Sequence, residues 1–122
     1  MAETVFTIKK DSRQDRFYFK FTPAVDLTGL SLLFSMVNRT TGAVKIDKVA
    51  AVIATGAHTI DGAAYTLTAA NGWGYYDWPG TADLDTVGNY GGEVWIVYPG
   101  PKYSKWPSDG LIQITVYEDA PI

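Results

Sequence analysis

An aromatic segment, residues 73–78, is the part of the chain best suited to bind a ligand. It contains two Trp, two Tyr and one Asp. Exposed flat rings flanked by carboxylates can stack on sugar rings and hydrogen-bond to their hydroxyl groups. Alternatively, every second ring of a strand fills the core and the others pack on a neighbouring subunit. The sequence leaves both interpretations open, and a carbohydrate site would use Trp73, Tyr75 and Trp106.

Residues 99–110 form a second candidate binding segment. It is rich in Pro and carries Tyr103, Trp106 and Pro107. Tyr and Trp on a stiffened loop can anchor a protein interface at low entropic cost. The alternative is that Trp106 closes one end of the core. The candidate interface residues are Trp73, Tyr75, Tyr103, Trp106 and Pro107.

Residues suited to catalysis or metal binding are sparse. His58 is the one histidine and the chain has no cysteine, so zinc-thiolate sites and clusters with two His ligands cannot form. We expect His58 to lie in a loop. None of the serines has the sequence context of a nucleophile elbow. We therefore expect a protein that is not an enzyme and that holds no metal and no cofactor.

Asp83 and Asp85 have the alternate spacing of carboxylates in a calcium loop. The further ligands and the distal glutamate of such a loop are missing. We expect instead a solvated turn whose acids bond to backbone amides.

Length and composition indicate one folded domain, residues 1–122, with a single core. The net charge is −3, and ten Lys and Arg residues are too few for a basic face, so we expect no direct contact with nucleic acid. No apolar run is long enough for a membrane helix, and residues 1–4 do not resemble a signal peptide. We expect no membrane partner and production in the cytoplasm without export.

Alternation of apolar and polar residues predicts a series of short strands. Phe17, Phe19 and Phe21 share one face of segment 16–21, and this period of two is typical of a half-buried strand. The predicted strands are 4–10, 16–21, 30–37, 43–53, 74–78, 89–98 and 111–118. Segments 79–88 and 99–110 are predicted to be loops.

Two segments allow more than one structure. The apolar residues of 45–54 also fit helical spacing, but Thr55 and Gly56 end the segment and no capping residue opens it, so a strand over 43–53 is favoured. In 58–69 a hairpin with its turn at Asp61–Gly62 fits the sequence. Together these elements predict an all-β fold, an immunoglobulin-like antiparallel β-sandwich of about seven to nine strands.

The order of several short motifs resembles that of a family of phage virion domains. The motif residues are Asp26, Leu27, Thr28 and Gly29 in a turn, Tyr76 and Trp78 in a Tyr-x-Trp strand, Gly88, Tyr90 and Glu93 in a Gly-x-Tyr-x-x-Glu segment, and Gly110 before the closing strand. In order and spacing they are similar to the N-terminal domain of the phage baseplate upper protein.

This resemblance implies a virion structural protein, a non-enzymatic assembly module of the tail or baseplate that is made in the host cytoplasm. Its partners would be other virion proteins, and it would act as a symmetric homo-oligomer or in many copies on the particle. Because the motifs end near the last residue, a capsid decoration protein or a head-fibre adaptor is an alternative. A carbohydrate-binding module for host-surface polysaccharide, using the aromatic residues above, is another.

Overall fold

The computed structural model describes residues 5–10, 16–21, 25–60, 62–80, 83–100, 102–106 and 112–117. This part of the chain holds ten strands, one 3-10 turn and no α-helix. The all-β prediction is confirmed, the number of strands exceeds the predicted seven to nine, and the helical alternative for 45–54 is wrong because β4 covers this segment up to Ile53. The elements are β1 Val5–Lys9, β2 Phe17–Lys20, β3 Ser31–Asn38, β4 Val44–Ile53, β5 Gly56–Ile60, β6 Ala63–Leu67, η1 Ala69–Asn71, β7 Trp73–Tyr76, β8 Gly88–Tyr98, β9 Lys102–Trp106 and β10 Ile112–Tyr117.

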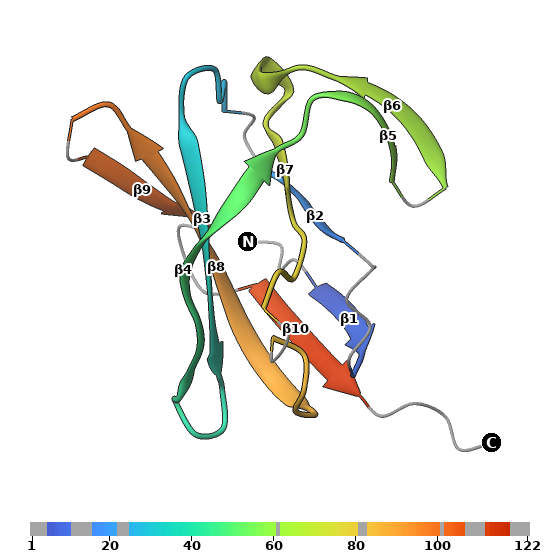
Figure 1. Cartoon of the computed structure of the whole chain (residues 1–122), viewed down its shortest axis with the longest axis vertical. Helices are drawn as coiled ribbons and strands as arrows, with labels where there is room; N and C mark the ends of the chain where they lie inside the picture. The colour runs from blue at the N-terminus through green and yellow to red at the C-terminus, as the bar shows by residue number, and fades with distance from the viewer. Residues whose placement is uncertain are drawn as a thin grey trace.

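Eight of the strands form one sheet that is nearly closed into a barrel (Figure 1). Its order is β1-β10-β8-β3-β4-β7-β2, and β9 pairs with the second half of β8, beyond the part that pairs with β10. The pair β1–β10 is parallel and the other pairs are antiparallel. The remaining strands, β5 and β6, form a small sheet of their own.

The strand β4 turns the sheet from one side of the molecule to the other. Its residues up to Ala51 pair with β3, whereas Val52 and Ile53 pair with β7. A bulge interrupts the β3–β4 register next to Lys48, which has a φ of 50° and whose backbone N–H donates to the Ser35 hydroxyl at 3.0 Å. Bulges bend a strand and increase its twist, so this one helps the sheet to curl.

Aromatic rings, and not backbone hydrogen bonds, join the two ends of the described sheet. The end strands are β1 and β2. Phe6 of β1 lies 4.8 Å from Phe17 of β2, centroid to centroid, and 6.0 Å from Trp78. The backbone of the described sheet is therefore open between β1 and β2, and aromatic side chains close the core there.

The core contains the inward-facing residues of each strand, as the period of two predicts. On β2 these are Phe17 and Phe19, and on β3 they are Leu32, Phe34 and Met36. The other buried apolar residues on strands of the large sheet are Ile8, Ile46, Tyr76, Tyr90, Val94, Ile96, Ile112, Ile114 and Val116.

The hairpin predicted around residues 61 and 62 is confirmed by β5 and β6, with His58 opposite Tyr65. Gly62 has a φ of 80°, a conformation that glycine adopts without steric cost. The hairpin packs on the outer face of β2 and β7 (Figure 1). A second, small core forms there from Ala54, Ile60 and Leu67 against Tyr18, Trp73 and Tyr75.

The loop predicted for 99–110 is wrong in part, because residues 102–106 form β9. Gly100 has a φ of 76°, and the Lys102 N–H donates to the Gly100 carbonyl at 2.7 Å. This tight turn directs the chain back along β8. The residues of β9 that share the inner face with Trp106 are Lys102 and Ser104, so apolar alternation could not reveal the strand.

Gly74 of β7 is required by the packing of the core. It lies opposite Phe19, and a Cβ there would come within 2.5 Å of Phe19 Cε1 and 2.8 Å of Leu32 Cδ1. Overpacking of this kind costs about 1–3 kcal/mol, so we expect Gly74→Ala to lower the free energy of unfolding by about that amount.

The matched control for this prediction is Gly88→Ala. A Cβ at Gly88 meets its nearest neighbour at 3.6 Å, an ordinary contact, so we expect a change below about 1 kcal/mol. Urea unfolding monitored by tryptophan fluorescence measures both variants. Equal stability of the two variants would contradict the packing described for Gly74.

Candidate functional site

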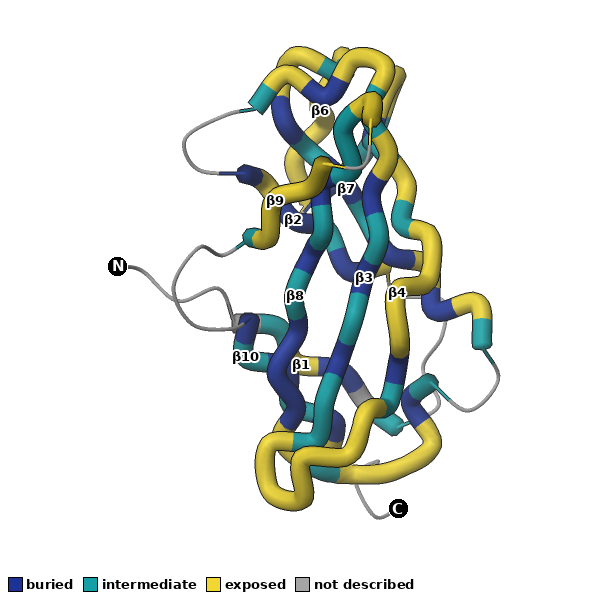
Figure 2. The backbone as a smooth tube through the Cα atoms, turned by 90° about the vertical axis from the view of Figure 1, so that its left-hand side faces the viewer, coloured by how far each residue is buried: buried dark blue, intermediate teal, exposed yellow. Residues whose placement is uncertain are grey.

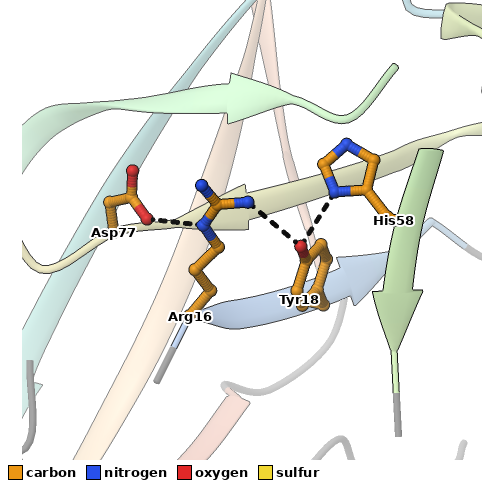
Figure 3. Close-up of polar contacts among 4 residues, drawn as sticks. All are labelled: Arg16, Tyr18, His58 and Asp77. Carbon is orange, nitrogen blue, oxygen red and sulfur yellow. Dashed lines mark hydrogen bonds and ion pairs between the residues drawn. The ribbon is translucent and has the colours of Figure 1, made fainter. Parts of the chain in front are cut away.

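A chain of polar contacts links the β5–β6 hairpin to β2 and β7 (Figure 3). The Asp77 carboxylate accepts from Arg16 Nε at 3.0 Å, and Arg16 Nη1 donates to the Tyr18 hydroxyl at 3.3 Å. The Tyr18 hydroxyl lies 2.9 Å from His58 Nδ1, and His58 Nε2 lies 2.9 Å from the Thr55 carbonyl. A carbonyl only accepts, so Nε2 carries a proton, and in the neutral ring Nδ1 accepts from Tyr18.

This chain of contacts fastens the hairpin to β2. Both nitrogens of His58 are engaged, and the hydrogen bond to Tyr18 raises the pKa of the Arg16 guanidinium, which is charged in any case. The guanidinium also lies 4.4 Å from the centroid of the Tyr75 ring. The Arg16–Asp77 ion pair is about half exposed, and such pairs contribute about 0–1 kcal/mol. We call Arg16, Tyr18, His58 and Asp77 the hairpin latch.

The structure corrects the expectation that His58 lies in a loop. His58 is a half-buried residue of β5, in edge contact with the Tyr18 ring at 5.6 Å. The sequence could not reveal this position for two reasons. Most residues of β5 are small and give no apolar alternation, and the partner Tyr18 lies 40 residues away in sequence.

A second group of aromatic residues lies on the outer face of β8 and β9. Trp95 and Tyr103 stack with centroids 4.6 Å apart and planes 24° apart. The ammonium groups of Lys105 and Lys48 lie 4.5 and 5.2 Å from the centre of the Trp95 ring, within the range of a cation–π contact. Tyr103 is 56% exposed. We call Trp95, Tyr103, Lys48 and Lys105 the Trp95 patch.

The Trp95 patch is presented by four neighbouring strands, β9, β8, β3 and β4 (Figure 2). Val94 and Ile96 face the core, so the alternation of β8 turns Trp95 outward. Glu93, also on this face, accepts a hydrogen bond from Trp95 Nε1 at 3.1 Å and orients the indole. Sequence reasoning missed Trp95, although its phase in the strand could have identified it.

The structure separates the predicted interface residues. Tyr103 belongs to the Trp95 patch, whereas Trp106 is half-buried on the inner face of β9, with its ring 5.3 Å from that of Phe21. Trp73 and Tyr75 are half-buried beneath the hairpin, where Trp73 contacts Tyr65 at 5.7 Å. Pro107 lies outside the described residues.

The turn at residues 26–29 is held by hydrogen bonds between its own residues. The Asp26 carboxylate accepts from the Thr28 N–H at 3.0 Å and from its hydroxyl at 2.6 Å, and these bonds lower the pKa of Asp26. Leu27 is buried, and Gly29 has a φ of 75°. The turn therefore places Leu27 in the core just before β3.

Three further motif residues, Tyr76, Trp78 and Tyr90, lie in the core. Tyr76 and Trp78 are buried, and burial, with the Asp83 carboxylate that accepts from the Tyr76 hydroxyl at 3.3 Å, raises the pKa of Tyr76. Tyr90 is buried, and its hydroxyl donates to the Thr86 carbonyl at 2.7 Å. Gly88 is the first residue of β8. Gly110 lies outside the described residues.

The predicted bond from an acid to a backbone amide is confirmed for Asp83, whereas Asp85 bonds to side chains. Asp83 accepts from the Gly80 N–H at 3.0 Å. Asp85 pairs with Lys45, and this hydrogen bond lowers the pKa of Asp85. In the described ranges, no group of three or more His, Asp or Glu side chains is arranged to hold a metal ion. Nor does that part of the chain contain a helix long and apolar enough to span a membrane.

A comparison with models of known protein families finds none that matches this chain, and a comparison with curated proteins finds no significant match.

The hairpin latch leads to a prediction for His58→Ala. The substitution removes the hydrogen bond that ties the hairpin to Tyr18 and a local one to the Thr55 carbonyl, each of which contributes about 0.5–1.5 kcal/mol. From this total of about 1–3 kcal/mol we expect amide hydrogen exchange in β5 and β6 to become about 5- to 150-fold faster through local opening. Exchange in β3 and β8 should not change.

Thr59→Ala is the matched control, because Thr59 is the next residue on β5, is exposed and lies on the opposite face of the hairpin. Exchange in the hairpin should remain as in the unmodified chain. If the amides of β5 and β6 exchange as slowly in the His58→Ala variant as in the unmodified chain, the latch does not hold the hairpin.

Proposed function

We propose that this chain is a non-enzymatic structural module of a phage virion, part of the tail or baseplate, that binds other virion proteins through an exposed sheet face. The Trp95 patch is the observation that carries the binding role. Trp and Tyr are the residue types that contribute most to protein interfaces. Here Trp95 is half-buried and bonded to Glu93, and Tyr103, which stacks on it, is 56% exposed.

The virion assignment rests on the order of the sequence motifs, from the turn at Asp26 to the segment that ends at Glu93. Leu27, Tyr76, Trp78 and Tyr90 are all buried in the core. This supports the proposal that the motifs form a structural framework shared with the phage virion domains that the sequence resembles.

Within this proposal the nearly closed sheet is an immunoglobulin-like sandwich. Rings from β2 and β7 meet Phe34 of β3 across the core, at 5.9 Å for Phe17 and 4.6 Å for Tyr76. Facing layers of this kind are the defining feature of a sandwich. The strand β4 would then lie in one layer up to Ala51 and join the other layer with its last two residues, Val52 and Ile53.

A flat binding face suits a particle built from repeated subunits. Each copy needs to bind only weakly when many copies act together. The lysines of the Trp95 patch, Lys48 and Lys105, would set the orientation of a partner, because charges at an interface contribute more to specificity than to affinity.

Incorporation into particles tests this proposal. Particles purified from cells that carry the gene are analysed for the chain by quantitative mass spectrometry. We expect Trp95→Ala and Tyr103→Ala each to reduce incorporation at least about tenfold, since hot-spot residues contribute about 2 kcal/mol or more. Tyr117→Ala, which removes another exposed tyrosine (41%), should be incorporated normally. Urea unfolding of all three variants separates loss of binding from loss of folding.

The outcomes distinguish the alternatives. Absence of the chain from purified particles contradicts the virion role. Recovery in heads rather than in tails favours a capsid decoration or head-fibre adaptor. Binding on a glycan array that is lost in Trp73→Ala, Tyr75→Ala or Trp106→Ala, without association with particles, favours a carbohydrate-binding module.

A further inference from the structure

The strand β6 is an unprotected sheet edge. The hairpin is a two-stranded sheet, so within the described residues the outer backbone groups of β6 have no strand partner. Four consecutive residues of β6, Ala63 to Thr66, are exposed. In Figure 1 the hairpin extends away from the large sheet with β6 on its outer side. A strand exposed in this way is ready to pair with another chain.

Charge distinguishes this edge from the other edges of the described sheets. Proteins commonly protect sheet edges with lysine. Here β1 contains Lys9, β2 contains Lys20, and β9 contains Lys102 and Lys105. Neither β5 nor β6 contains a charged residue. The protection found at the other edges is absent from the hairpin.

The hairpin also has little support of its own. A two-stranded hairpin is at best marginally stable in water, and three or more strands are needed for independent stability. The latch and the small core around Ala54, Ile60 and Leu67 hold it on one face only. A further strand along β6 would bond to its outer N–H and C=O groups.

We propose that β6 pairs in antiparallel fashion with β6 of a second copy of this chain, which gives a continuous four-stranded sheet. This inference rests on the proposed interaction role and names one partner for it. An uncharged strand can lie beside its own copy without placing like charges opposite each other. Antiparallel pairing about a twofold axis uses the same surface on both copies and closes as a dimer.

The edge of β6 fits this role better than that of β5. His58 of β5 is half-buried and bonded to Tyr18 beneath the hairpin. On β6, Ala64 and Thr66 face away from the body, opposite Thr59 and Ala57 of β5. Small side chains at these positions allow a second backbone to approach closely.

Sedimentation velocity of the purified chain, over a wide range of concentration, tests the proposal. We expect a monomer–dimer equilibrium. Thr66→Lys adds a lysine to each of the two paired β6 strands, where the like charges repel, and should weaken the dimer at least about tenfold. Thr59→Lys adds the same charge to the same face on β5 and should leave the dimer unchanged. A chain that is monomeric throughout, or an equal effect of the two lysines, overturns the proposal.

Cysteine cross-linking gives a second readout that does not depend on affinity. The chain has no cysteine, so a single cysteine can report only contact between copies. Ala64→Cys alone, Thr66→Cys alone and a mixture of the two variants report a twofold axis at residue 64, 66 and 65, respectively. Under mild oxidation one of the three should form disulfide-linked dimers, whereas Ser104→Cys on β9 should remain monomeric. Cross-linking no greater in β6 than at Ser104 rejects the pairing. If the purified chain does not dimerise but is still found in particles, the pairing of β6 is rejected and the proposed virion role is not.

Discussion

Contacts between aromatic rings at the two ends of the large sheet hold its curvature. Phe6 of β1 and Phe17 of β2 meet at 4.8 Å, and Phe17 in turn contacts Phe34 on the opposite wall at 5.9 Å. In the described residues the path of backbone hydrogen bonds runs from β1 to β2 without joining them. The core therefore depends on side chains to bring its ends together, and the Phe6–Phe17 contact determines which surfaces remain outside.

Alternation along the strands then divides the aromatic residues into two groups. Inward-facing rings such as Trp78 and Tyr76 fill the core. Of the outward-facing rings, Trp73 and Tyr75 are covered by the β5–β6 hairpin, whereas Trp95 and Tyr103 remain on an uncovered face. In the described residues strand phase thus leaves one stacked pair, Trp95 and Tyr103, on the outer face of the large sheet.

Local pattern predicted much of this fold and little of the site. The strands around Phe17, Phe34 and Ile114 follow from alternation because one face of each is buried. The strand β9 could not be predicted, because its turn at Gly100 and its pairing with β8 are tertiary features. The hairpin latch was also beyond prediction, since His58 meets Tyr18 only once the hairpin has folded over β2. Trp95 was within reach, because it lies between two core residues of the same strand.

Radical footprinting of the assembled particle tests the central claim most directly, that the face around Trp95 is where this protein meets its partner. Hydroxyl radicals oxidise exposed Trp and Tyr side chains, and the modification is read residue by residue in free and assembled protein. The account predicts that oxidation of Trp95 and Tyr103 falls several-fold on assembly while that of Tyr117 is unchanged. Undiminished oxidation of Trp95 and Tyr103 in the particle would contradict it.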